Sequence, residues 1–539
     1  MSAGEFRVPR PTNEAILNYA PESPERFALQ HQLARVAAEG PEIPVLAAGK
    51  EIHSGDTFDV VMPHAHHEKL ALLHQARAED VHTAIAGAMK VAPMWQAMSF
   101  HERAAVFLKA AELLAGPWRA RINAASMLAQ SKTCHQAEID AACELIDFFR
   151  FNVYFAEKIL SEQPISTGKE WNRMDYRPLE GFVFAVTPFN FLSIAMNLPS
   201  APALMGNVVL WKPANVTALG GWYVMQLLKE AGLPDGVISM LPGAGPEQGA
   251  AALASEHLAG IHFTGSTKTF KTLWKGVADN LDHYRSFPRI VGETGGKDFI
   301  LAHSSADLSA LTTAIIRGGY EYQGQKCSAA SRVYVPSSLW PKLREQVIAA
   351  IDEIRMGDPR DFSNFMSAVI DRRAYEKISG YIQLAEQSAT IHRGGKCDSK
   401  VGYFIEPTLV QVDNPRHRLM QEEIFGPVVT VYVYDDAKWT DALELVATTS
   451  PYALTGAVFA RDRAAIHDAE RELRHSAGNF YINDKPTGAV VGQQPFGGAR
   501  GSGTDDKAGS LWNLMRWVAP RAIKENFVPP TSYRYPFMG

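Results

Sequence analysis

The sequence predicts an α/β protein with two doubly wound α/β domains. At 539 residues the chain is too long for one hydrophobic core. Between residues 181 and 265 short apolar runs alternate with helical patterns, and a second stretch of this kind extends from about 290 to 480. Such alternation is typical of parallel sheets covered by helices, which bind ligands at the carboxyl ends of their strands.

The composition excludes several classes of protein. Hydrophobic residues make up 46% of the chain and charged residues 21%, as in ordinary soluble globular proteins. The net charge of -5 and the pI of about 6.4 argue against a general nucleic-acid binder, which would carry a basic face. No apolar run reaches the roughly 18 residues that a membrane span requires. We therefore expect neither a nucleic-acid nor a membrane partner.

Cysteine usage and the N-terminus indicate the compartment. The four cysteines show no C-x-x-C spacing, which predicts a reducing compartment and argues against a disulfide framework and a zinc site, so no metal is expected. The N-terminus lacks an apolar stretch and includes Glu5 and Glu14, which does not suit an acidic-poor transit peptide. The sequence thus predicts the cytoplasm, or the mitochondrial matrix if a presequence has been removed.

The first part of the chain is predicted to be mainly helical. Residues 1–60 are rich in Pro and polar side chains and are expected to wrap over the surface. The apolar periodicity over 101–114 predicts a helix that is closed by Gly116 and Pro117, and a longer helix is expected at about 136–156. Residues 161–180 are polar, and a plain surface loop is one interpretation of them.

Short apolar runs predict buried parallel strands in both α/β stretches. In the first stretch a helix over 217–231 ends at Gly232, and strands are expected at 182–186, 208–211, 237–241 and 261–263. In the second stretch, helices are expected at 339–354 and 437–446, and strands at 299–301, 332–335, 428–434 and 455–459. The glycines from Gly243 to Gly249 resemble a dinucleotide fingerprint, but the last gap is one residue too long, which favours a simple turn.

Two glycine-rich stretches carry groups that could perform catalysis. Cys327 follows Lys326, and a thiolate is a strong nucleophile whose formation a lysine can favour. Glu293 lies in the turn Val291-Gly-Glu-Thr-Gly-Gly-Lys297. Taken singly, a buried core cysteine and a solvated loop glutamate are the alternatives. Together, the two residues indicate a nucleophile and a base.

The two stretches resemble the aldehyde dehydrogenase superfamily, whose general base lies in an E-x-G-G-K motif and whose nucleophile ends a G-Q-x-C motif. The resemblance extends from about residue 60 to the C-terminus. It includes Thr187-Pro-Phe-Asn-Phe191, Trp211-Lys-Pro213, Phe263-Thr-Gly-Ser266, Glu422-Glu-Ile-Phe-Gly-Pro427 and Gln494-Pro-Phe-Gly-Gly-Ala-Arg500. The most similar branch is that of the 1-pyrroline-5-carboxylate dehydrogenases, on the basis of residues 138–142, 144–152, 325–328 and 478–485.

The resemblance implies NAD-dependent oxidation of L-glutamate γ-semialdehyde to L-glutamate in proline catabolism, through a cysteine thiohemiacetal and an acyl-thioester. Cys327 would be the nucleophile, Glu293 the base that activates water, and Asn190 an oxyanion donor beside the Cys327 N–H. Gln323 and Thr294 stand where the wider family often has Asn and Leu. The alternatives are a dehydrogenase for another carboxylate-bearing semialdehyde, a CoA-acylating enzyme, which Glu293 disfavours, and a catalytically silent binding or structural member of the fold.

The family motifs also imply the ligand contacts. The expected cofactor contacts are Thr187, Lys212, Gly265, Ser266, Glu423 and Phe425. Of these, Lys212 and Glu423 would hold the riboses, and the turn at Gly265 would meet the pyrophosphate. Asn215 is neither acidic nor basic, which leaves the choice between NAD and NADP open. The expected substrate contacts are Glu144, Phe191, Lys326, Ser328, Gly488, Ala489 and Phe496.

Within the substrate set, a carboxylate anchor is expected from the Ser328 hydroxyl and the backbone N–H groups at Gly488 and Ala489. Ala489 stands where this branch often has Ser, so a hydroxyl contact is lost while the main-chain donor remains. Phe191 and Phe496 would pack on the substrate's methylene groups.

The resemblance finally implies a domain plan and a homo-oligomer of at least two copies. The plan is 1–160, the first part of the NAD-binding domain with the N-terminal wrap; 161–180, a protruding oligomerisation hairpin; 181–290, the Rossmann-like part; 291–485, the catalytic thiol domain; and 486–539, the substrate-anchor loop with a C-terminal oligomerisation segment. Whether a proline dehydrogenase docks as a partner is left open.

Overall fold

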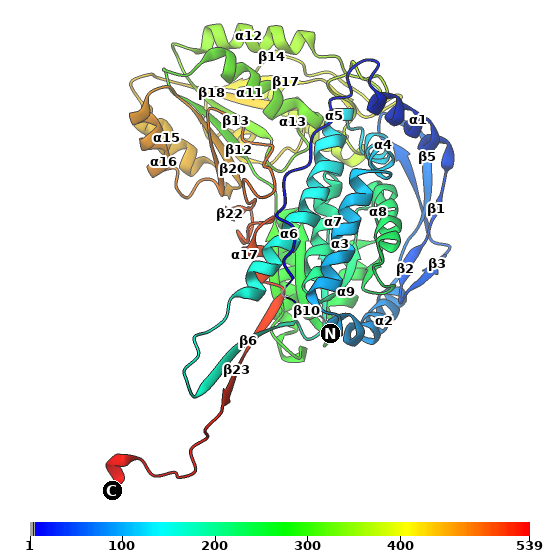
Figure 1. The fold of residues 1–539 in the computed structure, drawn as a ribbon. Coiled ribbons are helices and arrows are strands. Elements are labelled where there is room, and N and C mark those ends of the chain that lie inside the picture. The colour runs from blue at the N-terminus through cyan, green and yellow to red at the C-terminus, as the bar shows by residue number, and fades with distance from the viewer. Residues whose placement is uncertain (1–3, 5) are drawn as a thin grey trace.

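The computed structural model describes residues 4 and 6–539, which form two α/β bodies and a projecting arm (Figure 1). Each body is built on one seven-stranded sheet. A further sheet, in the order β1-β5-β4, belongs to the N-terminal part and consists of β1 (Glu42–Ile43), β4 (Thr57–Met62) and β5 (Ala65–His74). No helix within the described residues is long and apolar enough to cross a membrane.

The first large sheet has the strand order β11-β10-β7-β8-β9-β2-β3. Neighbours from β11 to β9 are parallel, whereas β2 is antiparallel to β9 and β3. The strands are β2 (Val45–Ala47), β3 (Lys50–Ile52), β7 (Phe182–Val186), β8 (Val208–Lys212), β9 (Ile238–Met240), β10 (Leu258–Thr264) and β11 (Arg289–Glu293). The strands predicted in this stretch are confirmed, because continuous apolar runs are what a sheet covered on both faces requires.

The second large sheet has the order β14-β17-β18-β13-β12-β20-β21, with only β14 antiparallel to its neighbour. The strands are β12 (Asp298–Ala302), β13 (Ala330–Pro336), β14 (Thr390–Arg393), β17 (Thr408–Val412), β18 (Val428–Tyr434), β20 (Thr455–Phe459) and β21 (Asn479–Ile482). Two short pairs accompany it, β15 (Cys397–Asp398) with β16 (Phe404–Ile405) and β19 (Tyr452–Ala453) with β22 (Ala499–Arg500).

Helices cover both sheets (Figure 1). The first body and its N-terminal part contain α1 (Pro24–Glu39), α2 (Ala78–Ala97), α3 (Phe100–Ala115), α4 (Arg119–Gln130), α5 (Cys134–Ala137), η1 (Glu138–Cys143), α6 (Glu144–Ser161), α7 (Leu192–Leu204), η2 (Asn215–Thr217), α8 (Ala218–Ala231), α9 (Gly245–Leu253), α10 (Thr267–Asp279) and η3 (Leu281–His283). The second contains α11 (Leu308–Tyr320), η4 (Glu321–Gly324), α12 (Trp340–Glu353), α13 (Arg372–Ser388), α14 (Arg418–Gln421), α15 (Trp439–Thr449) and α16 (Arg463–Glu472). The C-terminal part adds α17 (Leu511–Met515) and η5 (Pro536–Met538).

The predicted helix over 101–114 is confirmed as α3. Ser99 caps its first turn by accepting from the Glu102 N–H, while the Glu102 side chain accepts from the Ser99 N–H. The helix expected at 136–156 is longer and is not uniform. It passes from α5 through one π-helical segment, η1, into α6. Periodicity alone does not reveal the extra residue that a π turn inserts.

The N-terminal prediction is only partly correct. Residues 1–60 do more than wrap the surface, because β2 and β3 complete one edge of the first sheet and α1 packs against the core. In α1 the buried residues Leu29, Leu33 and Val36 recur at helical spacing after the cap Ser23, a signal that the prediction missed.

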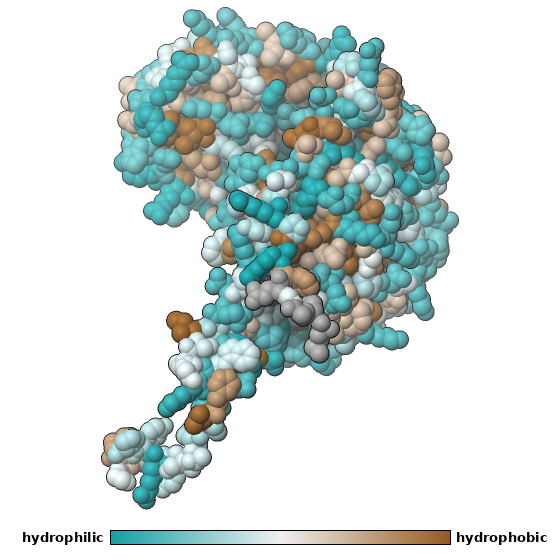
Figure 2. All heavy atoms as spheres, viewed as in Figure 1, coloured by the Kyte–Doolittle hydropathy of each residue, from teal (hydrophilic) through white to brown (hydrophobic). Residues whose placement is uncertain are grey.

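The hairpin expected within 161–180 is wrong in its pairing. The strand β6 (Glu170–Pro178) pairs antiparallel with β23 (Val518–Asn526), so the arm joins two distant parts of the chain. This arm stands away from the body and carries scattered hydrophobic side chains (Figures 1 and 2). The exposed ones at the arm and its tail include Ile165, Trp171, Phe527, Val528, Tyr533, Tyr535 and Phe537.

The expected domain boundary at 290/291 also needs correction. It falls inside β11, which pairs with β10 in the first sheet. The chain therefore passes to the second sheet between Glu293, the last residue of β11, and Asp298, the first residue of β12. The two catalytic candidates come from different bodies, since Glu293 ends a strand of the first sheet and Cys327 precedes β13 of the second.

Candidate active site

Cys327 and Glu293 meet at the border of the two bodies. The Cys327 thiol donates to Glu293 Oε1 across 3.6 Å. The backbone fixes the glutamate, because its carbonyl accepts from the Gly265 N–H at 3.1 Å and the following Thr294 N–H donates to the Ser502 carbonyl at 2.8 Å. The expected nucleophile and the expected base are thus held in direct contact before any substrate arrives.

Burial determines the charge state of this pair. It raises the pKa of Glu293 to about 8. The pKa of the Cys327 thiol is raised well above its ordinary value, first by burial and then by the neighbouring Glu293 carboxylate. Lys326 does not offset this effect, contrary to the expectation from sequence, because its ammonium lies 3.5 Å from Glu321 and 4.0 Å from Asp140. At neutral pH the resting pair is therefore a thiol beside a largely protonated carboxyl.

Asn190 lies in the loop between β7 and α7 and is buried. Its Nδ2 donates to the Gln325 carbonyl at 3.1 Å. That contact places the side-chain amide against the backbone segment leading into Cys327, where an oxyanion donor is required. Its catalytic role stays a prediction that this position supports.

A cavity of about 390 Å³ brings the expected substrate contacts together. Its lining includes Cys327, the expected nucleophile, and all the residues expected on the substrate side, namely Glu144, Phe191, Lys326, Ser328, Gly488, Ala489 and Phe496. Residues from four separate parts of the sequence therefore surround one space. Glu293 lies on a second, smaller cavity of about 40 Å³, which shares Glu144 and Phe496 with the first.

Polar groups lie at defined points of the large cavity. The Ser328 hydroxyl donates to Thr487 Oγ1 at 2.8 Å, so a threonine that the sequence prediction missed orients it. Gly488 has a φ of 93°, a conformation that favours glycine. Glu144 Oε2 accepts from the Ser193 hydroxyl at 2.6 Å, and burial, with the Asp140 charge, raises the pKa of Glu144 to about 8.

Four of the expected cofactor contacts, Thr187, Lys212, Gly265 and Ser266, lie at the carboxyl ends of strands in the first sheet. Lys212 ends β8, donates to the Pro213 carbonyl at 3.0 Å, and burial lowers its pKa to about 8. A Cβ added to Gly245, the first residue of α9, would lie 3.8 Å from Lys212 Cε. Ser266 caps α10 by accepting from the Thr269 N–H at 3.2 Å.

The remaining cofactor candidates lie in tight local structure. Glu423 accepts from the Phe425 N–H at 3.1 Å, and Phe425 has a φ of 60°. The Thr187 hydroxyl accepts from Trp211 Nε1 at 2.8 Å. A half-buried ammonium, a half-buried carboxylate and two helix N-termini match the diphosphate and ribose hydroxyls of a dinucleotide, so these residues fit NAD.

Comparison with known proteins decides the family. Residues 51–523 match the model of the aldehyde dehydrogenase family. The chain belongs to this family. That assignment and the predicted aldehyde dehydrogenase fold are confirmed, and the solved relatives below share the fold over the whole chain.

Several family members are similar over nearly their full length. The chain is 50% identical over 536 residues to the mitochondrial delta-1-pyrroline-5-carboxylate dehydrogenase of Dictyostelium discoideum, covering 98% of this chain and 96% of that one. It is 48% identical over 529 residues to the mitochondrial enzyme of the same name from Homo sapiens, covering 98% and 94%.

Solved structures of the family agree. The chain matches the delta-pyrroline-5-carboxylate dehydrogenase of Mycobacterium tuberculosis bound with NAD, with a TM-score of 0.97, 52% identity and complete coverage of both chains. The 1-pyrroline-5-carboxylate dehydrogenase from Thermus with bound NAD matches with a TM-score of 0.90 and 32% identity, covering 98% of this chain and 100% of that one.

The two residues that differ from those common in the wider family, Gln323 and Thr294, have structural roles. Gln323 adopts a φ of 56°, and its amide donates to the Ser131 and Ala368 carbonyls while accepting from the Ser367 N–H. This side chain fastens the turn that precedes Cys327. The Thr294 hydroxyl donates to the Gly501 carbonyl at 2.6 Å, which ties the loop after Glu293 to the C-terminal part.

Lys297 closes the family motif around Glu293 but received no role from the sequence. Its ammonium is buried and donates to the Ser331 hydroxyl at 2.6 Å. Burial lowers the pKa of Lys297, opposed by the Glu423 carboxylate. Lys297 links the loop after Glu293 to β13, the strand that follows Cys327. Its position at the end of the E-x-G-G-K motif could have indicated this role from the sequence.

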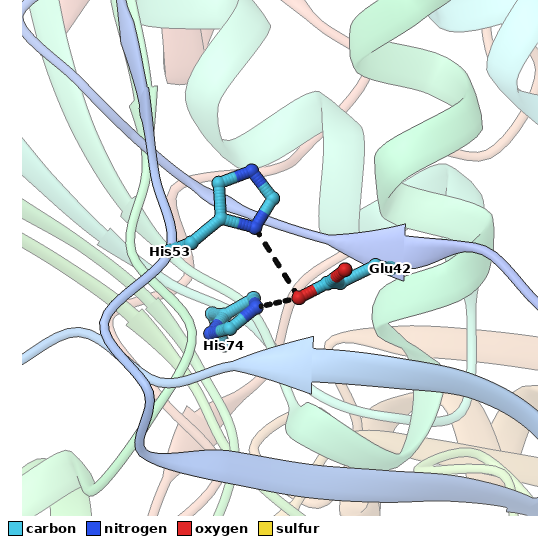
Figure 3. A group of neighbouring side chains, drawn as sticks. All are labelled: Glu42, His53 and His74. Atoms are coloured by element: carbon cyan, nitrogen blue, oxygen red, sulfur yellow. Dashed lines mark hydrogen bonds and ion pairs between the residues drawn. The ribbon is translucent and has the colours of Figure 1, made fainter.

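Three side chains outside the cavity could supply metal ligands. Figure 3 shows Glu42, His53 and His74 directed toward one another. His74 Nε2 lies 2.5 Å from Glu42 Oε1, and His53 Nδ1 lies 3.4 Å from it. The Gly55 N–H donates to His74 Nδ1 at 3.2 Å, which places the imidazole proton on Nε2, facing the carboxylate. A metal on Nε2 would need the other tautomer and would break that bond, so the contacts favour a carboxylate shared by two imidazoles.

Proposed function

We propose that this chain catalyses the NAD-dependent oxidation of L-glutamate γ-semialdehyde, the open form of 1-pyrroline-5-carboxylate, to L-glutamate. The observation that carries the proposal is the cavity of about 390 Å³, which has the Cys327 thiol in its wall and the Ser328 and Gly488 region beside it. A nucleophile and polar anchors in one space suit an aldehyde with a carboxylate at its far end. The full-length relatives named for this activity support the same substrate.

Acylation begins with the loss of the Cys327 proton to solvent water. The Sγ bonds to the aldehyde carbon, and the carbonyl oxygen becomes an oxyanion stabilised by Asn190 Nδ2 and the Cys327 N–H. Bound NAD supplies the hydride acceptor. As the carbon gives up its hydride, the C=O bond re-forms and leaves a thioester on Cys327.

Hydrolysis uses Glu293 as the base. Its carboxylate removes a proton from water, and the water oxygen bonds to the thioester carbon. The C–S bond then breaks, Cys327 leaves as a thiolate, and glutamate is released. A pKa of about 8 makes Glu293 a stronger base than an exposed carboxylate, because the burial that disfavours its charge also favours its protonation.

The direct test compares NADH formation from pyrroline-5-carboxylate with that from propanal. A site that hydrogen-bonds a polar group rejects analogues that lack it far more strongly than an apolar pocket rejects a missing methylene. Glutamate semialdehyde should therefore exceed an unsubstituted aldehyde by roughly 10³ or more in kcat/KM. Equal efficiency for the two substrates would contradict the proposed substrate, and the absence of NADH with both would favour a silent member of the fold.

The anchor is tested with Gly488→Val. The φ of 93° at this residue strains any larger side chain, and a Cβ would lie 2.8 Å from Lys485 Nζ. We expect a severe loss of kcat/KM for glutamate semialdehyde and a much smaller one for propanal. Gly380→Val is the matched control, since Gly380 lies exposed in α13 with nothing within 4 Å of an added Cβ. Equal losses for the two substrates would show that Gly488 is not part of the anchor.

For assembly, we propose that the β6–β23 arm packs against a second copy of the chain, which would cover its exposed apolar side chains. Two variants test this: a chain shortened by residues 527–539, and Trp171→Ser. Light scattering should show that each shifts toward the monomer. For the compartment, we propose the cytoplasm, with the mitochondrial matrix as the alternative. Microscopy of the tagged chain tests this. Co-purification tests whether a proline dehydrogenase docks.

A further inference from the structure

An extended N-terminal segment, residues 8–20, lies against the substrate cavity. We call it the N-terminal strap; it carries no helix or strand and runs beside α6, where it is the dark blue trace in Figure 1. Asn13, Glu14 and Ile16 line the cavity of about 390 Å³. The same cavity is lined by residues of the segment 485–493, which we call the anchor loop. Strap and loop are thus neighbouring parts of one wall.

Asn13 links the anchor loop to α6. Its Nδ2 donates to the Val491 carbonyl in the loop and to Asp147 Oδ2 on α6, both at 2.8 Å. Its Oδ1 accepts from Gln493 Nε2 at 2.9 Å. One amide therefore uses both of its polar ends to hold two points of the loop against the helix that begins with Glu144.

The strap itself is firmly attached beyond Asn13. Glu14 accepts from Arg119 and Arg150, each at 2.7 Å, and its backbone N–H donates to Asp147 Oδ1 at 2.8 Å. Further along, the Tyr19 hydroxyl donates to Glu138 at 2.7 Å. Charge-assisted bonds of this kind are stronger than neutral ones, so Asn13 sits on a fixed support rather than on a loose terminus.

The anchor loop contains two glycines in an unusual backbone conformation. Gly488 and Gly492 both have positive φ values, and Gly488 is exposed. Glycines of this kind leave a backbone free to adopt several conformations unless hydrogen bonds select one. The bonds from Asn13 to Val491 and Gln493 fall directly after the segment whose N–H groups are proposed to meet the substrate carboxylate.

We propose that Asn13 is a positioning residue for substrate specificity: it holds the anchor loop at the distance from Cys327 that a carboxylate-bearing aldehyde requires. The inference rests on the proposed function, because it assigns to the strap the placement of that function's carboxylate anchor. Asn13 acts through the loop and contacts none of the reacting atoms.

The test is Asn13→Ala, with Asn18→Ala as the matched control. Asn18 lies exposed on the same strap, and its side chain accepts from the Ala20 N–H. For glutamate semialdehyde we expect Asn13→Ala to lower kcat/KM by about 10- to 100-fold, mainly by raising KM, since the three hydrogen bonds to Val491, Gln493 and Asp147 are lost. Propanal turnover should change by less than about threefold, and Asn18→Ala should change neither substrate.

A second readout does not depend on activity. Amide hydrogen exchange across residues 485–493 should become faster in Asn13→Ala and stay unchanged in Asn18→Ala, while exchange in α6 stays slow in both. Equal loss for both aldehydes, or unchanged exchange in the loop, would overturn the inference and leave the proposed function standing. A wild-type enzyme that does not prefer glutamate semialdehyde to propanal would overturn the proposed function, and this inference with it.

Discussion

Glu293→Gln is the substitution with the sharpest expected outcome. It keeps the shape of the side chain and removes its charge from a position 3.6 Å from the Cys327 sulfur. An ionised Glu293 opposes the thiolate, so this carboxylate and burial together raise the pKa of Cys327. The substitution should therefore make the thiol easier to ionise while it abolishes the base that hydrolysis needs.

The size of the effect follows from the distance. Two unit charges at 3.6 Å in an effective dielectric of about 20 interact by about 4–5 kcal/mol, which corresponds to roughly three pKa units as an upper limit. With a pKa of about 8, roughly one tenth of Glu293 is ionised at pH 7, so the full effect develops only at higher pH. We expect the pKa of Cys327 to fall, because a charge that opposes the thiolate is removed.

Two assays separate the effect of Glu293 on the Cys327 thiol from its role as the base in hydrolysis. The rate of alkylation by iodoacetamide against pH reports the thiolate, and its midpoint should fall in Glu293→Gln. Stopped-flow NADH formation should keep its burst and then stall as the acyl-enzyme, with steady-state turnover lower by about 10²–10⁴. Wild-type hydrolysis should rise with pH until Glu293 is ionised at about 8 and then level off, whereas the variant should lack this inflection.

Glu144→Gln is the matched control for the thiol. Burial, with the Asp140 charge, raises the pKa of Glu144 also to about 8, but its carboxylate accepts from Ser193. Removal of the Glu144 carboxylate should leave the pH midpoint for alkylation of Cys327 unchanged. The reasoning would be refuted if Glu293→Gln lost the burst together with turnover, or if its alkylation midpoint stayed in place or rose. Loss of the burst would mean that Glu293 takes the proton of Cys327, and an unchanged or higher midpoint would mean that the Glu293 charge does not oppose the thiolate.

Three further predictions concern single side chains. Cys327→Ala should abolish aldehyde oxidation and leave NAD affinity within a few-fold by calorimetry; substantial residual turnover would exclude it as the nucleophile. Asn190→Ala should slow the NADH burst itself by about 10²–10³, the usual loss for one oxyanion donor, and a normal burst would remove it from the oxyanion site. Glu138→Ala should lower the free energy of unfolding by about 3–5 kcal/mol in urea, because it leaves the buried Arg119 without the carboxylate that pairs with it. A loss below about 1 kcal/mol would show that Glu14 and solvent suffice for Arg119.

Much of the site could be predicted because its chemistry lies in short contiguous motifs. Cys327 and Glu293 were identified from their glycine-rich neighbours, and the buried strands of both sheets from apolar runs. The expected substrate contacts were named by motif and line one cavity, although their individual roles stay predictions. In such segments, local sequence determines the local backbone, so the sequence also determines which side chains stand beside one another.

Other features depend on contacts between parts of the chain that no local pattern connects. The arm pairs β6 with β23, and its Arg521–Asp175 contact spans 346 positions. Asn13 meets Val491 across 478 positions, and the membership of β11 in the first sheet is fixed by its pairing with β10. The charge states of Cys327 and Glu293 could not be predicted from the sequence either, because burial depends on the whole fold. The sequence by itself thus determined the fold class and indicated the candidate reacting groups, whereas the tertiary structure decided their environment, since desolvation and long-range pairing arise only when distant segments pack.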